Sequence, residues 1–458
     1  MTKTLSSVAH ELNSTFIGED LSFKDISIDT RNLTKDSLFI ALKGNSFNGN
    51  DFICDAQKRG AIGAIVSERS ESVLPQIEVK DTKLALGTLA KAWRKNFDLP
   101  VIAITGSNGK TTVKELVSNI IKQSNNVCVS KENYNNDIGL PITIMGLKEK
   151  DQVLILELGA NHSGEISYLS SIAKPTIGLI TNASASHLEG FGSVNDVAEA
   201  KGELLDHLSS DKGFAIINAD DHFCNYWFKR CKAKNKLTFG LSSSANCNIS
   251  GKIKYINGHS CFTISLPDNN LIDINLPLPG IHNVINALAA ALVSYASGMS
   301  SEDIAYGLSN VKPVKGRLFK ISGKNGSVII DDTYNANPVS SKAAIDYLSG
   351  FSQKRILVFG NMAELGSNKK KFHSEIGDYA RDKCDLLFTI GDLAKLASDS
   401  FGKGSESFDD ELVLTSKIEE HLDDNVVVLV KGSRFMKMEK IINQLTNSNK
   451  DKQNENLL

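Results

Sequence analysis

Cysteine motifs and an excess of charge of one sign are both missing from this sequence. The chain has 458 residues but only seven cysteines, which are scattered and never form a CxxC pair. An odd, dispersed set argues against a disulfide framework or a zinc site and is typical of reduced cytoplasmic thiols. The formal net charge is only −2, which argues against a large basic surface for nucleic acid or an anionic membrane.

Long hydrophobic runs are missing too. No apolar run reaches the roughly 18 residues that a membrane-spanning helix needs, and residues 1–16 lack the uninterrupted apolar core of a signal peptide. Hydrophobic residues make up 41% and charged residues 23% of the chain, which is ordinary for a globular protein. We therefore expect a cytoplasmic protein without membrane insertion, and the length suggests about three domains.

The most informative stretch present is residues 101–121. An apolar run at 101–104 predicts a buried strand, and apolar residues recur at helical spacing after residue 112. A glycine-rich loop between a strand and a helix N-terminus is the geometry that binds phosphate. Its spacing, GxxGK[ST], is two residues shorter than the general pattern GxxxxGK[ST]. In such a loop, Lys110 would contact the terminal phosphates of a nucleotide and the Thr111 hydroxyl would bind magnesium. The alternative is a simple glycine turn. The candidate phosphate-binding residues are Gly106, Ser107, Asn108, Gly109, Lys110, Thr111 and Thr112.

The alternation of strand and helix patterns predicts an α/β protein with three domains. Residues 1–82 read as a small α/β unit without a nucleotide loop. Residues 83–313 carry the glycine-rich loop, and their apolar strands alternate with helical stretches, which predicts a mostly parallel, doubly wound sheet. Residues 314–447 predict a second, Rossmann-like unit without such a loop, and residues 448–458 form a polar tail.

Three residues of the middle domain are candidates for metal binding or catalysis. Glu157 lies in an apolar strand, where a carboxylate needs a partner, and we favour a magnesium ligand over a structural ion pair. His187 follows the strand at 177–180, and ligands bind at the carboxyl ends of parallel strands. A structural role for His187 fits the pattern equally well. From pattern alone, Lys201 reads as an exposed lysine on a helix.

Polar residues in other loops have either ligand-binding or ordinary structural interpretations. Asn135 and Asn136 lie in an asparagine-rich loop, where they hydrogen-bond a sugar or peptide group or shape a turn. Asn283 either caps the apolar helix at 284–295 or contacts a base edge. Arg31 either holds a phosphorylated ligand or is a solvated charge. The strand ends of the third domain carry polar side chains suited to a charged substrate, namely Asp332, Asn335, Lys431 and Arg434.

Together these motifs resemble the Mur ligases of peptidoglycan synthesis, in which the short GxxGK[ST] loop is the usual form. The resemblance covers nearly the whole chain. The segments that carry it are 105–112, 157–162, 187–192, 201–203, 282–283 and 331–338. Three residues depart from the family pattern: Asn361 stands where aspartate is common after Gly360, and Asn48 and Asn50 stand where aspartate and histidine are common.

The resemblance implies roles that the patterns alone do not give. Thr111 and Glu157 would hold one magnesium ion and His187 a second. Lys201 would be carbamylated by carbon dioxide, and the anionic carbamate would help to bind the second ion. The catalytic residues would be Lys110, His187 and Lys201. Further ATP contacts would come from Asn283 and Arg317. Substrate contacts would come from Thr30, Arg31, Asn135, Asn136, Asp332, Tyr334, Asn335 and Asn337.

The resemblance also implies a reaction and its partners. Segments 135–141 and 362–366 are most similar to those of the family member that uses ATP to join D-alanyl-D-alanine to UDP-N-acetylmuramoyl-tripeptide through an acyl phosphate. The first domain would bind the UDP-sugar, the second ATP and the third the dipeptide, and the family expectation is a monomer. The third residue of the tripeptide stays open between lysine and diaminopimelate. The alternatives are another ligase of this superfamily, adding the third amino acid or a folate polyglutamate tail, and a nucleotide-dependent switch protein.

Overall fold

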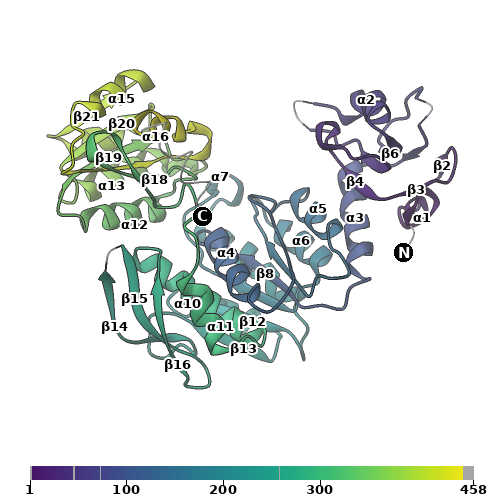
Figure 1. Cartoon of the computed structure of the whole chain (residues 1–458), viewed down its shortest axis with the longest axis horizontal. Coiled ribbons are helices and arrows are strands. Elements are labelled where there is room, and N and C mark those ends of the chain that lie inside the picture. The colour runs from purple at the N-terminus through teal and green to yellow at the C-terminus, as the bar shows by residue number, and fades with distance from the viewer. Residues whose placement is uncertain (1–2, 45–46, 73, 257, 447–458) are drawn as a thin grey trace.

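A computed structural model describes residues 3–44, 47–72, 74–256 and 258–446. The tail expected at 448–458 lies outside the described residues. The chain forms three α/β domains, as predicted, and in Figure 1 the first and third lie at opposite ends of the molecule with the middle domain between them. None of the described helices combines the length and hydropathy that crossing a membrane requires.

The N-terminal domain is a small mixed sheet with the strand order β2-β7-β6-β5-β4. Only β2 runs antiparallel to its neighbour. Helix α3 leads into the middle domain, and it begins after Asp81 because this side chain accepts the N–H groups of Lys83 and Leu84. The elements are β1 (Lys3–Thr4), α1 (Leu5–Glu11), β2 (Phe16–Ile17), β3 (Ser22–Phe23), β4 (Asp25–Ser27), β5 (Ser37–Ile40), α2 (Ile53–Lys58), β6 (Ala61–Val66), β7 (Gln76–Glu78) and α3 (Thr82–Arg94).

The middle domain is built on a six-stranded sheet with the order β13-β12-β11-β8-β10-β9, in which all neighbours are parallel. The predicted doubly wound sheet is therefore confirmed. Because β8 lies between β10 and β11, the loops after these three strands meet at one edge. The elements up to the last parallel strand are β8 (Val101–Thr105), α4 (Lys110–Ile121), β9 (Val127–Val129), α5 (Gly139–Met145), β10 (Val153–Glu157), α6 (Glu165–Ala173), β11 (Ile177–Ile180), α7 (Leu188–Phe191), α8 (Val194–Gly202), β12 (Phe214–Asn218), α9 (Cys224–Arg230) and β13 (Asn235–Phe239).

An antiparallel sheet of three strands follows β13, and we did not predict it from the sequence. Its strands β14 (Asn248–Ile256), β15 (His259–Ser265) and β16 (Leu271–Leu276) pair in chain order. Residues along β15 and β16 alternate between buried and more exposed, which is typical of a sheet with one face on the core.

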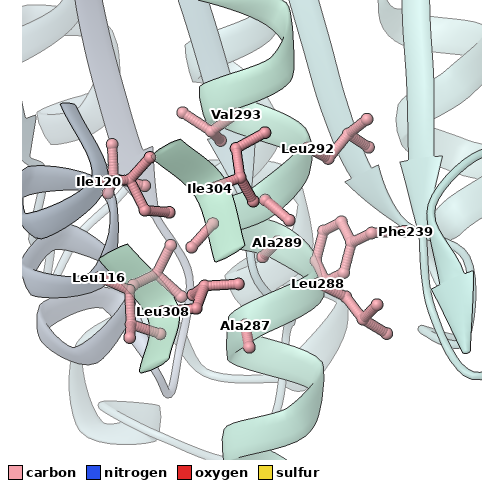
Figure 2. Packing of buried hydrophobic residues seen from close by; sticks show 14 of the residues in the cluster. Leu116, Ile120, Phe239, Ala287, Leu288, Ala289, Leu292, Val293, Ile304 and Leu308 are labelled. Atoms are coloured by element: carbon pink, nitrogen blue, oxygen red, sulfur yellow. The ribbon is translucent and has the colours of Figure 1, made fainter. Parts of the chain in front are cut away.

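Helix α10 (Ile281–Ala296) is the buried centre of this domain, and α11 (Ser301–Ser309) packs beside it. Figure 2 shows Leu116 and Ile120 of α4 and Leu308 of α11 on one side of α10, with Phe239 of β13 on the other. Alanines along α10 let its neighbours approach closely. This packing fixes the start of α10 beside the glycine-rich loop.

The C-terminal domain is a Rossmann-like sheet with the order β17-β18-β22-β19-β20-β21, in which only β17 is antiparallel. The loops after β18, β19 and β22 lie together because these strands are neighbours. Each main sheet falls within one of the ranges 1–82, 83–313 and 314–447, and this division stays a prediction. The elements are β17 (Phe319–Ser322), β18 (Val328–Asp332), α12 (Pro338–Ser349), β19 (Lys354–Gly360), α13 (Lys369–Ala380), β20 (Leu386–Ile390), α14 (Lys395–Phe401), β21 (Ser405–Phe408), α15 (Glu411–Glu419), β22 (Val426–Lys431) and α16 (Glu439–Leu445).

Candidate active site

A cavity of about 650 Å³ lies between the middle and C-terminal domains. Loops at the carboxyl ends of strands line it from both sheets, which is where ligands bind in such folds. Most residues predicted from the sequence meet there. Those that line the cavity are Ser107, Asn108, Gly109, Lys110, Thr111, Thr112, Asn135, Glu157, His187, Asn283, Arg317, Asp332, Tyr334, Asn335 and Asn337.

The glycine-rich loop joins β8 to α4. Gly109 caps α4 with a φ of 83°, a conformation that favours glycine. A Cβ at this position would lie 2.4 Å from Oδ1 of Asn286 in α10, so the packing also requires glycine. Nζ of Lys110 donates to the carbonyl of Gly106 at 2.7 Å, and burial lowers the pKa of Lys110. The loop therefore presents a lysine and a helix N-terminus to the cavity, as phosphate binding requires.

Glu157 ends β10 and is 2% exposed. The hydroxyl of Thr111 donates to Oε2 at 2.8 Å, and Nδ2 of Asn135 donates to Oε1 at 2.8 Å. Nη2 of Arg317, which comes from the C-terminal side of the cavity, donates to Oγ1 of Thr111 at 2.9 Å. The Arg317 guanidinium also stacks on Tyr334, 4.3 Å from the ring centroid. A chain of contacts thus connects the third domain with the buried carboxylate.

The donor set around Glu157 fits magnesium. In the described part of the chain, no three His, Cys, Asp or Glu side chains converge closely enough to hold a metal ion. Magnesium does not need such a cage, because it is usually bound by one or two carboxylates together with water and substrate phosphates. The hydroxyl of Thr111 and the carboxylate of Glu157 are oxygen donors of the kind that magnesium takes, and they lie beside the glycine-rich loop.

His187 lies after β11, at the boundary with the C-terminal domain. Its backbone is left-handed, with a φ of 54°. Nδ1 is 2.5 Å from Oε2 of Glu364, close enough for an ion pair but not in line for a hydrogen bond, and the contact lowers the pKa of the Glu364 carboxyl. We did not predict this pairing, because nothing in the sequence relates two loops of different domains.

Lys201 lies in α8 and is 1% exposed, so the pattern-based expectation of an exposed lysine is wrong. Burial lowers its pKa to about 7, and the charge of Lys110 contributes. An ordinary lysine has a pKa near 10.4, so this amine is neutral to an unusual extent at pH 7. Lys201 does not line the cavity; its Nζ lies 5.3 Å from the centroid of the Phe191 ring.

A buried ion pair organises the C-terminal wall of the cavity. Nζ of Lys431, at the end of β22, lies 2.6 Å from Oδ2 of Asp332, at the end of β18. The same Nζ donates to the carbonyl of Asn335 at 2.9 Å. Burial raises the pKa of Asp332, while the charge of Lys431 opposes this rise. The pair therefore fixes the loop that carries the predicted substrate contacts.

Asn283 does not have the capping role that we considered. Gly280 is the N-cap of α10, and the helix begins at Ile281 rather than at residue 284. Nδ2 of Asn283 donates to the carbonyl of Pro279 at 2.7 Å, and its Oδ1 accepts from Nδ2 of Asn286 at 3.2 Å. The side chain still lines the cavity, so its contact with ATP stays a prediction.

Some predicted residues lie away from the cavity. Asn136 has a turn role, because its Oδ1 accepts the N–H of Gly139 at 2.9 Å. Thr30 and Arg31 belong to the N-terminal domain, where the exposed Arg31 pairs with Asp29 at 2.7 Å. A ligand that contacted both Arg31 and the cavity would have to extend from one domain to another.

Lys114 is a further residue that we did not predict. It lies in α4 with its side chain fully buried. Nζ donates to the carbonyls of Ser130 at 2.8 Å and Glu132 at 3.3 Å, just before the loop that carries Asn135. The lysine therefore connects α4, which follows the glycine-rich loop, with the asparagine-rich loop. A lysine among the apolar positions of α4 was the only indication in the sequence.

Family models cover most of the chain in three consecutive segments. Residues 22–94 match "Mur ligase family, catalytic domain", residues 104–294 match "Mur ligase middle domain", and residues 316–434 match "Mur ligase, glutamate ligase domain". The chain belongs to the Mur ligase family. This confirms the resemblance inferred from the motifs.

Similar proteins cover this Mur ligase almost from end to end. The UDP-N-acetylmuramoyl-tripeptide–D-alanyl-D-alanine ligase of Escherichia coli is 38% identical over 446 residues, covering 96% of this chain and 98% of that protein. The crystal structure of MurF from Acinetobacter baumannii has a TM-score of 0.91 and 31% identity, covering 97% and 99% of the two chains. MurF from Thermotoga maritima in complex with ADP has a TM-score of 0.83 and 27% identity, covering 92% and 97%.

Proposed function

We propose that this Mur ligase uses ATP to join D-alanyl-D-alanine to UDP-N-acetylmuramoyl-tripeptide, forming the pentapeptide precursor of peptidoglycan in the cytoplasm. The observation that carries the proposal is the cavity, where the phosphate loop of the middle domain faces the charged strand ends of the C-terminal domain. The similarity over almost the full length to the UDP-N-acetylmuramoyl-tripeptide–D-alanyl-D-alanine ligase of Escherichia coli supports the choice of substrates. Residues 1–82, 83–313 and 314–447 would bind the UDP-sugar, ATP and the dipeptide.

The first step requires an activated carboxylate. The terminal carboxylate of the tripeptide attacks the γ-phosphorus of ATP, the bond to the β-phosphate oxygen breaks, and an acyl phosphate and ADP result. Phosphoryl transfer is accelerated mainly by positioning and charge neutralisation. Residues 106–112 would hold the phosphates, with Lys110 on their terminal oxygens. Asn283 would contact the base, and Arg317, which already reaches Thr111, would neutralise charge from the C-terminal side.

The proposed magnesium ligands are Thr111 and Glu157 for one ion, and His187 and carbamylated Lys201 for a second. When bound, magnesium neutralises charge on the phosphate oxygens. The lowered pKa of Lys201 favours carbamylation, because only a neutral amine attacks carbon dioxide. The carbamate would turn a buried amine into a buried anion, which needs a cation beside it.

In the second step the amine of D-alanyl-D-alanine attacks the acyl carbonyl, loses a proton, and phosphate leaves. Asp332, Tyr334, Asn335 and Asn337 would bind this dipeptide or the ribose from the C-terminal wall. Thr30 and Arg31 would contact the UDP-sugar, and Asn135 and Asn136 the muramoyl-tripeptide. The domain contact across the cavity would keep water from the acyl phosphate, which water would otherwise hydrolyse.

Phosphate release from purified protein tests this proposal. With ATP, magnesium and UDP-muramoyl-tripeptide, we expect release only after D-alanyl-D-alanine is added, and not after single D-amino acids or L-lysine. Lys110→Met should lose at least about 100-fold in rate, because it removes the cation on the transferred phosphate. Lys122→Met, at the exposed end of the same helix, should keep the wild-type rate. Release that does not depend on the dipeptide would contradict the proposal.

A further inference from the structure

The loop at 361–366 of the C-terminal domain is held firmly by its own domain. The N–H of Met362 donates to Nε2 of His373 at 2.8 Å, and this histidine is completely buried. The N–H of Ala363 donates to Oγ of Ser433 at 2.7 Å. Because neighbouring residues are anchored in this way, the backbone position of Glu364 is set by the C-terminal domain and not by its partner across the boundary.

Glu364 uses this position to contact the middle domain twice. Its carbonyl accepts the N–H of Leu188 at 2.8 Å, and its Oε2 lies 2.5 Å from Nδ1 of His187. Both Glu364 and His187 have left-handed backbones, with φ values of 60° and 54°. Two residues that rarely adopt this conformation therefore do so where the two domains meet.

The contact decides which nitrogen of His187 is available to a ligand. Oε2 of Glu364 lies against Nδ1, although not in line for a hydrogen bond, and the imidazole lines the cavity. The negative charge of a carboxylate this close to one ring nitrogen favours the proton on that nitrogen and leaves the lone pair of the other nitrogen for a metal ion. Glu364 also lines the cavity, so its carboxylate belongs to the site and not to a remote surface.

We propose that Glu364 is a positioning residue that orients the His187 imidazole for a divalent cation, so that the cation site of the middle domain is complete only while the C-terminal domain lies against it. This inference rests on the proposed role of His187 as a ligand. Its consequence is that closure of the third domain, which brings the dipeptide, also prepares the site where ATP reacts. Carboxyl activation is thereby coupled to the presence of the acceptor domain.

The test measures binding of Mn²⁺ to the full-length protein with ADP, by electron paramagnetic resonance, without peptide substrates. Glu364→Ala should weaken Mn²⁺ binding by about 10-fold or more, the range seen when the partner of a ligating histidine is removed. Glu364→Gln should retain more of the affinity than Glu364→Ala, because its amide oxygen can still face Nδ1 with partial negative charge. The control is Glu419→Ala, which removes a carboxylate of similar exposure that is paired with Lys324 in the same domain; it should bind Mn²⁺ like the wild type.

A second readout uses the metal-free protein with ¹⁵N-labelled histidine. The chain has nine histidines, and the His187 signals can be assigned by their loss in His187→Gln. We expect the Nδ1–H tautomer in the wild type and in Glu364→Gln, and a mixture in Glu364→Ala. Unchanged tautomer or unchanged Mn²⁺ affinity in Glu364→Ala would overturn the inference, as would wild-type Mn²⁺ binding by His187→Gln. If the expected Mn²⁺ pattern appears but no dipeptide is ligated, the inference stands and the proposed function fails.

Discussion

Nδ2 of Asn337 donates a hydrogen bond to Oδ1 of Asn108 at 2.7 Å, joining the start of α12 in the C-terminal domain to the glycine-rich loop of the middle domain. Asn337 is also the N-cap of α12, where its Oδ1 accepts the N–H of Ser340 at 2.9 Å. Asn108 is fixed on its own side, since its N–H donates to Oδ1 of Asn182 at 3.0 Å. The side-chain amide of Asn337 therefore both caps α12 and connects the two domains.

The two roles of Asn337 can be separated by substitution. Asn337→Asp keeps an excellent N-cap but replaces the donor to Asn108 with a carboxylate, so the protein should remain as stable as the wild type. Its kcat should fall by up to about 10-fold, because a lost neutral hydrogen bond costs up to about 1.5 kcal/mol, and about 1.4 kcal/mol corresponds to a factor of ten in rate. Asn337→Ala should in addition lose about 1 kcal/mol of stability. Steady-state kinetics and urea unfolding measure both, and an unchanged kcat in Asn337→Asp would contradict the coupling.

Arg317 should not tolerate replacement by lysine. Its guanidinium both stacks on Tyr334 and donates to Thr111, and an ammonium group cannot do both. We expect Arg317→Lys to lower kcat/KM for ATP by about 100-fold, equivalent to about 2.7 kcal/mol of transition-state stabilisation. Arg434→Lys is the control, because Arg434 is exposed and pairs only with Glu439 among the contacts described. Similar losses in both variants would argue against a specific role for the guanidinium of Arg317.

Lys201 predicts a dependence of activity on both pH and carbon dioxide. With a pKa of about 7, the amine is mostly protonated below pH 7, so at a fixed, limiting concentration of dissolved carbon dioxide the activity should fall as the pH falls through 7. Added bicarbonate should restore it. Lys201→Ala should be inactive and partly rescued by a short-chain carboxylic acid. Full activity of Lys201→Ala without the acid would refute the carbamate.

The same lysine predicts how stability depends on pH. Because the pKa is lowered in the folded state, the unfolded chain binds the extra proton between about pH 7 and pH 10. Without carbon dioxide, the free energy of unfolding should therefore rise with pH across this window, relative to Lys201→Met. If the free energies of unfolding of the two proteins changed with pH in the same way across this window, Lys201 would have an ordinary pKa.

Replacing Lys114 should weaken binding of the tripeptide substrate more than binding of ATP. Lys114→Met leaves the carbonyls of Ser130 and Glu132 without their donor, so the loop that carries Asn135 should loosen. We expect a loss of about 2 kcal/mol of stability and a rise in KM for the UDP-sugar substrate, with KM for ATP nearly unchanged. An equal rise in both KM values would indicate a general defect instead.

Much of the fold followed from local patterns in the sequence. Strand β11 has the expected bounds, because a continuous apolar run between polar ends is typical of a strand in a parallel sheet covered on both faces. The antiparallel sheet of β14 to β16 escaped prediction, since its half-exposed strands alternate and contain few long apolar runs. Asn283 was considered as a cap from its place before an apolar segment, but the Gly280 backbone starts the helix one turn earlier.

Much less of the site's internal pairing could be predicted. Glu157 stood out because a carboxylate in an apolar strand needs a partner, yet its partners Thr111 and Asn135 are brought to it only by the tertiary fold. Asn361, which departs from the family pattern, accepts the N–H of Ala394 at 2.8 Å. The amide oxygen of Asn361 accepts this hydrogen bond without a negative charge, so the turn does not need the aspartate that is common in the family.

The mass of the product shows whether this Mur ligase joins D-alanyl-D-alanine to UDP-N-acetylmuramoyl-tripeptide. Purified protein is incubated with ATP, magnesium, D-alanyl-D-alanine and UDP-N-acetylmuramoyl-tripeptide, with lysine or diaminopimelate as the third residue in separate reactions. We expect, for at least one tripeptide, a product heavier than that tripeptide by one dipeptide minus one water, formed together with one ADP and one phosphate. ADP and phosphate without such a product, or a product formed equally from a single amino acid, would contradict it.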